Sequence, residues 1–243
     1  MRGTVGPLWL AWLATAGAAG GCSLLDEVGG GVLSFALPEV TFQIATTDPR
    51  WWPCPPERAG GIPDVVCRGT VALVTDCCQP PAPMVALDCQ EYPLSCDDDD
   101  MCALAFDYDD AVEINLGRDV LALQQQHHLV LAQATVDQID TTMFGPDAGA
   151  DALPLRAVSL WVAPRGTTSA PAAGAVFLAD VPFMPGEGPV DLAADARLAF
   201  STFLADFNTP FALILSSHVV VKSGPVPTGT ATFIVGGRVN ASF

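Results

Sequence analysis

The chain of 243 residues has little positive charge, with 10 lysine and arginine residues against 27 aspartate and glutamate residues. Lys222 is the sole lysine, and the formal net charge is -17 at pH 7. A charge of this sign repels phosphate backbones and anionic lipid headgroups. The composition therefore argues against nucleic acid as a partner and against binding to a membrane surface by electrostatic attraction.

The sequence also lacks the short motifs that identify common enzyme classes. It contains no G-x-S-x-G turn of serine hydrolases and no phosphate-binding glycine loop that carries a lysine. The adjacent residues His127 and His128 do not fit a metal site, because neighbours in a strand point to opposite faces. The same alternation places Ser217 and His218 on opposite faces of an apolar strand, which predicts a structural role for His218.

Residues 1–21 have the pattern of a secretory signal peptide. Arg2 precedes an uncharged stretch whose apolar block is at residues 8–14, and small residues fill the remainder as far as Gly21. The stretch ends in Ala19-Gly20-Gly21-Cys22, which resembles the lipobox of bacterial lipoproteins that signal peptidase II processes. The resemblance implies that Cys22 carries acyl chains such as palmitate and becomes the first mature residue. The alternative is an ordinary secretory signal, with Cys22 in a disulfide.

The likeness to envelope lipoproteins of GC-rich Gram-negative bacteria also implies a location. In that family Ser23 after the cysteine favours the outer membrane, where the lipid-anchored domain would lie at the periplasmic face or at the cell surface. Residues 22–33 include a glycine run and are expected to form a tether. No later apolar stretch has the length of a membrane span. We therefore expect residues 34–243 to form a single domain held by the lipid.

Cysteine is absent after Cys102 and crowded before it. After a signal peptide, clustered cysteines indicate disulfides, whereas zinc is disfavoured because no pair has the spacing of a zinc knuckle. With three bridges among seven cysteines about 105 arrangements are open, and Cys77 and Cys78 are expected to have different partners. The candidates are Cys54, Cys67, Cys77, Cys78, Cys89, Cys96 and Cys102.

Proline is frequent in residues 47–102, the segment that holds these cysteines. Proline fixes the backbone and removes a hydrogen-bond donor, so long regular elements are not expected there. We predict a disulfide-stapled, proline-rich loop region inserted into the domain. Trp51 and Trp52 begin it, either packed against disulfides or exposed as an aromatic platform for carbohydrate or another partner.

Outside this insertion the pattern predicts a mainly β fold, an antiparallel β-sandwich with one packed amphipathic helix. Apolar residues recur at three- and four-residue steps over residues 191–207, which predicts the helix. For residues 119–126 the sequence is compatible with either a strand or a short helix. Alternating apolar and polar residues predict strands at 39–45, 69–75, 102–106, 111–116, 128–139, 160–163, 176–179, 211–221 and 230–243.

Aspartate is concentrated in residues 97–110. If disulfides crowd these carboxylates into one loop, they are candidate calcium ligands, and a solvated acidic loop is the alternative. An EF-hand is excluded because Ala111 and Val112 stand where that loop needs an oxygen ligand and glycine. Calcium is the one cofactor that the sequence suggests. The candidate ligands are Asp97, Asp98, Asp99, Asp100, Asp107, Asp109 and Asp110.

These features favour a lipid-anchored envelope protein without catalytic activity, which has a structural role or binds an envelope protein or polysaccharide. The alternative is a secreted hydrolase that uses carboxylates on envelope polymers; no catalytic residue is assigned. Two carboxyl groups facing each other across a cleft, one with a raised pKa, would favour the hydrolase. A flat acidic surface would favour binding.

Overall fold

The computed structural model describes residues 32–48, 50–51, 94–96, 99, 101–124, 133–144, 153–182, 186–222 and 227–242. In these residues the chain is mainly β with antiparallel sheets, which confirms the predicted class. Residues 1–31 and 32–243 are separate units. The predicted signal peptide and the strand predicted at 69–75 lie outside the described residues.

One sheet has four strands in the order β1-β9-β4-β7. These are β1 (Val32–Ala45), β9 (Thr230–Ser242), β4 (Gln133–Phe144) and β7 (Gly186–Val190). β1 begins earlier than the pattern predicted, because Val32 and Leu33 continue its pairing with β9. The register of β1 shifts between Leu37 and Val40, next to Pro38, which cannot donate a ladder hydrogen bond.

The second sheet has five strands in the order β2-β3-β8-β5-β6. These are β2 (Leu94–Cys96), β3 (Cys102–Ile114), β8 (Phe211–Val221), β5 (Leu155–Pro164) and β6 (Val176–Asp180). β3 is one strand where the sequence predicted two, since its pairing with β8 is unbroken from Leu104 to Ile114. Asp107, Asp109 and Asp110 therefore lie in a regular strand and not in a loop.

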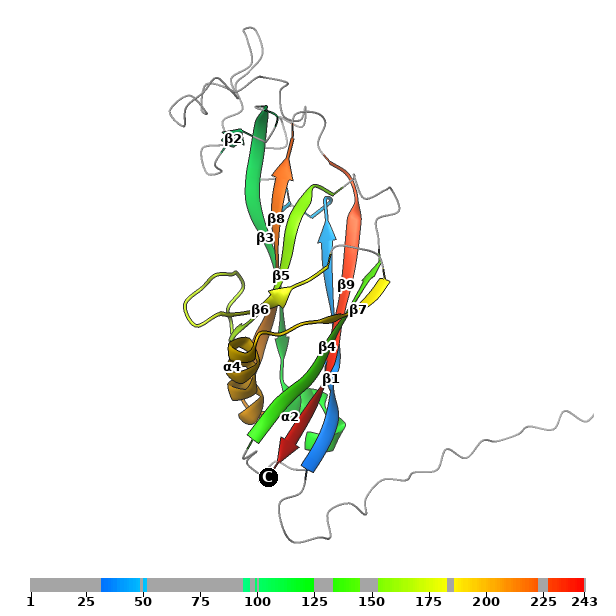
Figure 1. The fold of residues 1–243 in the computed structure, drawn as a ribbon, viewed down its shortest axis with the longest axis vertical. Helices are drawn as coiled ribbons and strands as arrows, with labels where there is room; N and C mark the ends of the chain where they lie inside the picture. The colour runs from blue at the N-terminus through cyan, green and yellow to red at the C-terminus, as the bar shows by residue number, and fades with distance from the viewer. Residues whose placement is uncertain are drawn as a thin grey trace, which may run out of the picture. The chain divides into compact units, whose positions relative to one another are not determined.

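The two sheets contribute to one hydrophobic core. Phe42 of β1 and Phe233 of β9 belong to the same buried cluster as Leu160 of β5 and Leu215 of β8. Along most of β9, buried residues alternate with more exposed ones because successive side chains point to opposite faces. Figure 1 shows the long strands of the two sheets running alongside each other.

The longest described helix, α4 (Ala194–Ala205), lies within the range 191–207 predicted from the apolar period. Its buried residues Ala196, Phe200 and Leu204 follow one another at four-residue steps and join the core. α4 packs against β4 of one sheet and β6 of the other, and Figure 1 shows it beside the strands. The helix therefore covers an edge between the two sheets.

Two short helices follow β3, and they resolve the alternative left open for residues 119–126. They are α2 (Leu116–Asp119) and α3 (Leu121–Gln124). α2 begins after Asn115, whose side chain accepts a hydrogen bond from the Arg118 amide. None of the described helices has the length and apolar character needed to cross a membrane.

Candidate functional site

The face of β3, β8 and β5 that points away from the core carries a group of polar side chains, which we call the outer acidic face. Its members are Asp107, Asp109, Ser159, Ser216 and His218. Tyr108 and Ser217, which alternate with them along the strands, are buried. The prediction that Ser217 and His218 lie on opposite faces is confirmed.

Asp107 and His218 form a hydrogen-bonded pair on this face. They are opposite each other in the register of β3 and β8, and Nδ1 of His218 lies 2.8 Å from Oδ1 of Asp107. Their side chains are 58% and 47% exposed, so water screens the pair. His218 is thus a surface residue that a carboxylate orients.

An aspartate that orients a histidine is one half of a catalytic triad, and the other half is a serine within reach of the histidine. Ser216 precedes His218 by two positions on the same face of β8. Its register partner is Asp109, and its hydroxyl lowers the pKa of that carboxyl. Among the described residues, the hydrogen bonds include none between Ser216 and His218, so the arrangement lacks the step that activates a serine.

Asp109 is the half-buried carboxylate of the outer acidic face. Burial raises the pKa of Asp109, hydrogen bonds from Ser216 and the Ala170 amide lower it, and the charge of Asp107 raises it further. Its Oδ2 accepts the Ala170 amide at 3.3 Å. Its Oδ1 is buried and has no well-formed hydrogen bond within the described part of the chain. The net effect favours the protonated form more than in a free aspartate.

The segment between β5 and β6 covers part of this face. Ala170 comes from that segment and packs in a small buried cluster with Ala163, Ala212 and Ile214.

Asp107 and Asp109 lie two positions apart on the same strand and on the same face of the sheet. One carboxyl therefore has a raised pKa, but the two do not face each other across a cleft.

A second polar group joins the end of β1 to β3. Asp48 Oδ2 accepts hydrogen bonds from the Tyr108 hydroxyl at 2.8 Å and from Arg50 Nη2 at 2.7 Å. The Arg50 guanidinium also lies 5.1 Å from the centre of the Tyr108 ring, within cation-π range. The hydrogen bond from Arg50 holds the pKa of Asp48 well below its usual range, and burial raises the pKa of Tyr108.

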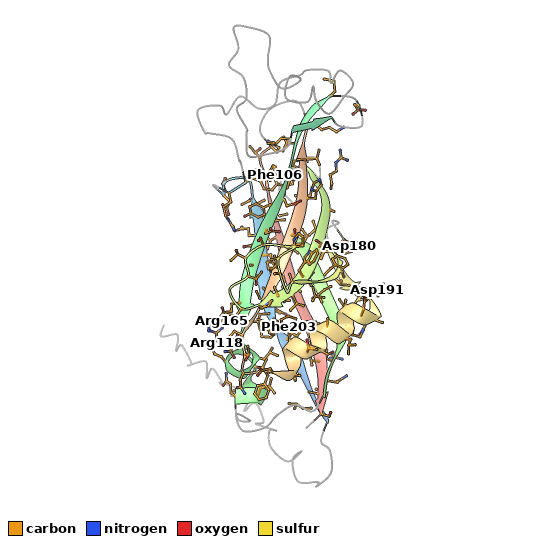
Figure 2. The ribbon with its side chains drawn as sticks, turned by 90° about the vertical axis from the view of Figure 1, so that its left-hand side faces the viewer. Phe106, Arg118, Arg165, Asp180, Asp191 and Phe203 are labelled. Atoms are coloured by element: carbon orange, nitrogen blue, oxygen red, sulfur yellow. The ribbon has the colours of Figure 1, made fainter. Side chains whose placement is uncertain are left out.

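Trp51 lies beside this network and is fully buried. Its ring centre is 5.8 Å from that of Phe106 and 5.7 Å from that of Tyr108. Figure 2 labels Phe106 on β3, away from the end where Arg118 lies. Trp51 is therefore not an exposed platform for carbohydrate, and its described ring contacts are with aromatic residues of β3. Trp52 lies outside the described residues.

The aspartates proposed as calcium ligands do not form one group where the structure describes them. Asp99 Oδ2 accepts a hydrogen bond from Lys222 Nζ at 2.7 Å, whereas Asp110 Oδ2 accepts one from the Gln43 amide at 3.2 Å. Asp107 and Asp109 have the separate partners given above. The described residues contain no set of three or more side chains placed to hold a metal ion. Asp97, Asp98 and Asp100 lie outside them, and calcium stays a prediction.

Most of the cysteine predictions fall outside the described residues. The backbone is described only for the pair Cys96 and Cys102, which are opposite each other in the register of β2 and β3. The lipidation and disulfide predictions therefore remain predictions. Those outside are Cys22, Cys54, Cys67, Cys77, Cys78 and Cys89.

The network around Asp48 was not anticipated from the sequence. Asp48 and Tyr108 are 60 positions apart, and no spacing rule connects them. The pairing of Asp107 with His218 spans 111 positions and depends on the alignment of β3 with β8. A sequence signal for either contact would require knowledge of which strands are neighbours.

Comparison with known proteins assigns no family. No family model matches the chain, and no similar curated protein was found. A solved structure of Desmodium yellow mottle tymovirus aligns at 13% identity over 100% of this chain and 96% of that chain, with a TM-score of 0.27. One of turnip yellow mosaic virus aligns at 10% identity over 74% and 90%, with a TM-score of 0.26. TM-scores this low support no conclusion about fold or function.

Proposed function

We propose that this chain is a lipid-anchored protein of the bacterial outer membrane whose β-sandwich domain has a structural role or binds a partner. The observation that carries the proposal is the lipobox-like sequence Ala19-Gly20-Gly21-Cys22 ahead of a separate folded unit that begins at Val32. An acylated Cys22 would hold the protein firmly, because three acyl chains bind a bilayer far more strongly than one.

The short distance from Cys22 to Val32 limits where the domain can act. An extended chain advances about 3.3 Å per residue, so the linking residues span at most about 33 Å. The net charge of -17 repels anionic lipids within a Debye length of about 8 Å at physiological salt. The domain would therefore remain near the membrane without lying against it, where it can contact other envelope components.

The outer acidic face supports binding better than catalysis. Asp107 and His218 are exposed, and their polar atoms are accessible to hydrogen bonds from a partner. Such groups suit the basic side chains of an envelope protein or the hydroxyl groups of a polysaccharide. The two carboxyls of this face lie side by side, whereas glycosidic cleavage needs carboxyls on either side of the bond.

Replacement of Cys22 by alanine tests the anchor. Cells that express the full chain are labelled with radioactive palmitate and fractionated, and the membranes are separated on a density gradient. We expect the wild type to carry label in the outer membrane and Cys22→Ala to be unlabelled and absent from it. Ser23→Ala is the matched control, since it keeps the cysteine and should keep the label. An unlabelled Cys22→Ala variant that stays in the membrane pellet would contradict the proposal.

The carboxylate-dependent hydrolase remains a second candidate because of Asp109. A carboxyl with a raised pKa is suited to act as a general acid, and the carboxyl of Asp107 lies on the same face of the strand. Purified protein is incubated with peptidoglycan and with extracted envelope polysaccharide, and released reducing ends are measured. Release that Asp109→Asn and Asp107→Asn each abolish would establish this candidate. Absence of release by the wild type would eliminate it.

A further inference from the structure

We propose that Cys96 and Cys102 are joined by a disulfide bond. The two residues are register partners and form the last pair of the β2–β3 hairpin. Residues opposite each other in an antiparallel pair have Cα atoms about 4.5 to 5.5 Å apart and lie on the same face. A disulfide requires a Cα separation of about 4.4 to 6.8 Å. The backbone therefore permits the bond without rearrangement, which no sequence spacing establishes.

A cross-link at this pair would also stabilise the hairpin, because β2 is short. β2 has 3 residues and is an edge strand that pairs with β3 alone among the described strands. The segment that joins Cys96 to Cys102 contains four consecutive aspartates, whose negative charges repel one another. The Asp99–Lys222 ion pair offsets part of this repulsion, but it is exposed and its contribution is small. A covalent bond at the hairpin's end holds the strands together.

The bond forms by thiol–disulfide exchange. The thiolate of one cysteine attacks the disulfide of an envelope dithiol oxidase and forms a mixed disulfide, which the thiolate of the other cysteine then displaces. The two thiols lose two protons and two electrons, and the oxidase is reduced to its dithiol. This inference rests on the proposed function to the extent that export to the envelope supplies the oxidant.

The bond also narrows the remaining pairings. Five cysteines are then left between residues 54 and 89, and two bridges among them allow about 15 arrangements instead of about 105. The odd cysteine must be one of these five. Cys96 and Cys102 then take no part in the pairings among the five earlier cysteines.

Peptide mapping of the full chain taken from the envelope tests the pairing. Free thiols are alkylated without reduction, and the chain is cleaved with cyanogen bromide at Met101 and with glutamyl endopeptidase after Glu91 and Glu113. Cys96 and Cys102 then lie in separate peptides, 92–101 and 102–113, each with no other cysteine. We expect one mass equal to the two peptides joined, which reduction separates. Joining of peptide 102–113 to another cysteine peptide, or its alkylation, would overturn the proposal.

Single substitutions supply the matched controls. Cys96→Ser should release peptide 102–113 with an alkylated Cys102, whereas Cys89→Ser should leave the joined mass unchanged. A wild-type mass that joins peptide 102–113 to the peptide containing Cys89, and that Cys89→Ser removes while Cys96→Ser does not, would show that Cys89 is the true partner and overturn the proposal. Because the wild-type map is read first, a variant that fails to fold does not decide the outcome.

A second measurement separates this inference from the proposed function. Lipid-labelled protein with an alkylated Cys102 would overturn the disulfide and leave the anchor intact. If the chain is not exported, the purified full chain is refolded in a mixture of oxidised and reduced glutathione and mapped in the same way. We expect the Cys96–Cys102 bond to exceed every other pairing of Cys102 there. A different favoured partner would overturn the inference whatever the location.

Discussion

At the scale of single residues, Asp48 links segments that are far apart in the sequence. Its carboxylate accepts hydrogen bonds from Arg50, two positions away, and from Tyr108 on β3. Trp51 lies next to the same network, where its ring contacts those of Phe106 and Tyr108. Because hydrogen bonds to a charged group are the stronger kind, this carboxylate fixes the end of β1 on the second sheet.

We expect Asp48→Asn to lower the free energy of unfolding by about 1 to 2 kcal/mol at pH 7. The pKa of Asp48 is lower in the folded chain than the value of about 3.9 in an unfolded one. Its carboxylate therefore stabilises the fold above about pH 5, and this contribution is lost as the pH falls below about 4. Urea unfolding of the wild type and of Asp48→Asn at pH 7 and pH 3 measures this contribution. We expect the two free energies of unfolding to differ less at pH 3 than at pH 7.

Glu113→Gln is the control for the Asp48 prediction. Glu113 pairs with Arg165 at 3.2 Å, and both side chains are exposed. Removal of this pair should change the free energy of unfolding by less than about 0.5 kcal/mol. Equal effects of the two substitutions would show that the Asp48 network is no stronger than an ordinary surface pair.

Asp109 should behave in the opposite way. Burial raises the pKa of Asp109, so its ionised form is disfavoured in the folded chain and stability falls as the pH rises through that raised pKa. Asparagine keeps an oxygen that can accept the Ala170 amide and carries no charge. We expect Asp109→Asn to raise the Tm at pH 7 and to match the wild type at pH 3. Asp107→Asn, which removes an exposed charge, should give no increase; a lower Tm for Asp109→Asn would refute the prediction.

At the scale of elements, the sequence predicts what depends on local period. β8 lies at residues 211–221 as expected, because short continuous apolar runs at 211–215 and 219–221 are typical of a buried strand. The sequence pattern predicts two strands in place of β3, because Asp107, Asp109 and Asp110 are typical of a loop. In the sheet Asp107 pairs with His218, Asp109 accepts a hydrogen bond from the Ala170 amide, and Asp110 accepts one from the Gln43 amide, so each of these aspartates has a partner. Those partners come from distant segments of the chain, which periodicity does not reveal.

Helix α4 offers a prediction at the same scale. Phe200 is fully buried and its ring packs edge-on against Phe211 of β8 at 5.9 Å. Phe200→Ala should lower the free energy of unfolding by about 3 to 5 kcal/mol, since it removes buried apolar area and leaves a cavity. Leu198, on the same helix, is 71% exposed, so Leu198→Ala should change it by less than about 0.5 kcal/mol. Similar losses in urea unfolding for the two variants would contradict this account of the helix.

At the scale of the whole molecule, the net charge of -17 opposes compaction. Raising the ionic strength from about 0.01 M to 0.15 M shortens the Debye length from about 30 Å to about 8 Å and weakens this repulsion. The Tm should therefore rise with sodium chloride over this range. Differential scanning calorimetry at pH 7 measures it, and a Tm that is constant or falls would show that the charges are already compensated in the fold.

Calcium tests whether a divalent cation relieves the repulsion between the acidic residues and whether it does so at a specific site. We expect millimolar calcium to raise the Tm at low salt, because divalent ions neutralise crowded carboxylates more effectively than sodium does. Asp99, Asp107 and Asp110 have separate partners in the structure, so the effect should come from general neutralisation, with magnesium equally effective and with high salt removing it. A formed cage would instead bind calcium at about 0.1 to 1 mM and discriminate against magnesium. A calcium-specific shift that survives high salt and disappears when Asp107 and Asp109 both become asparagine would establish such a cage. No shift at low salt would reject both forms of calcium binding.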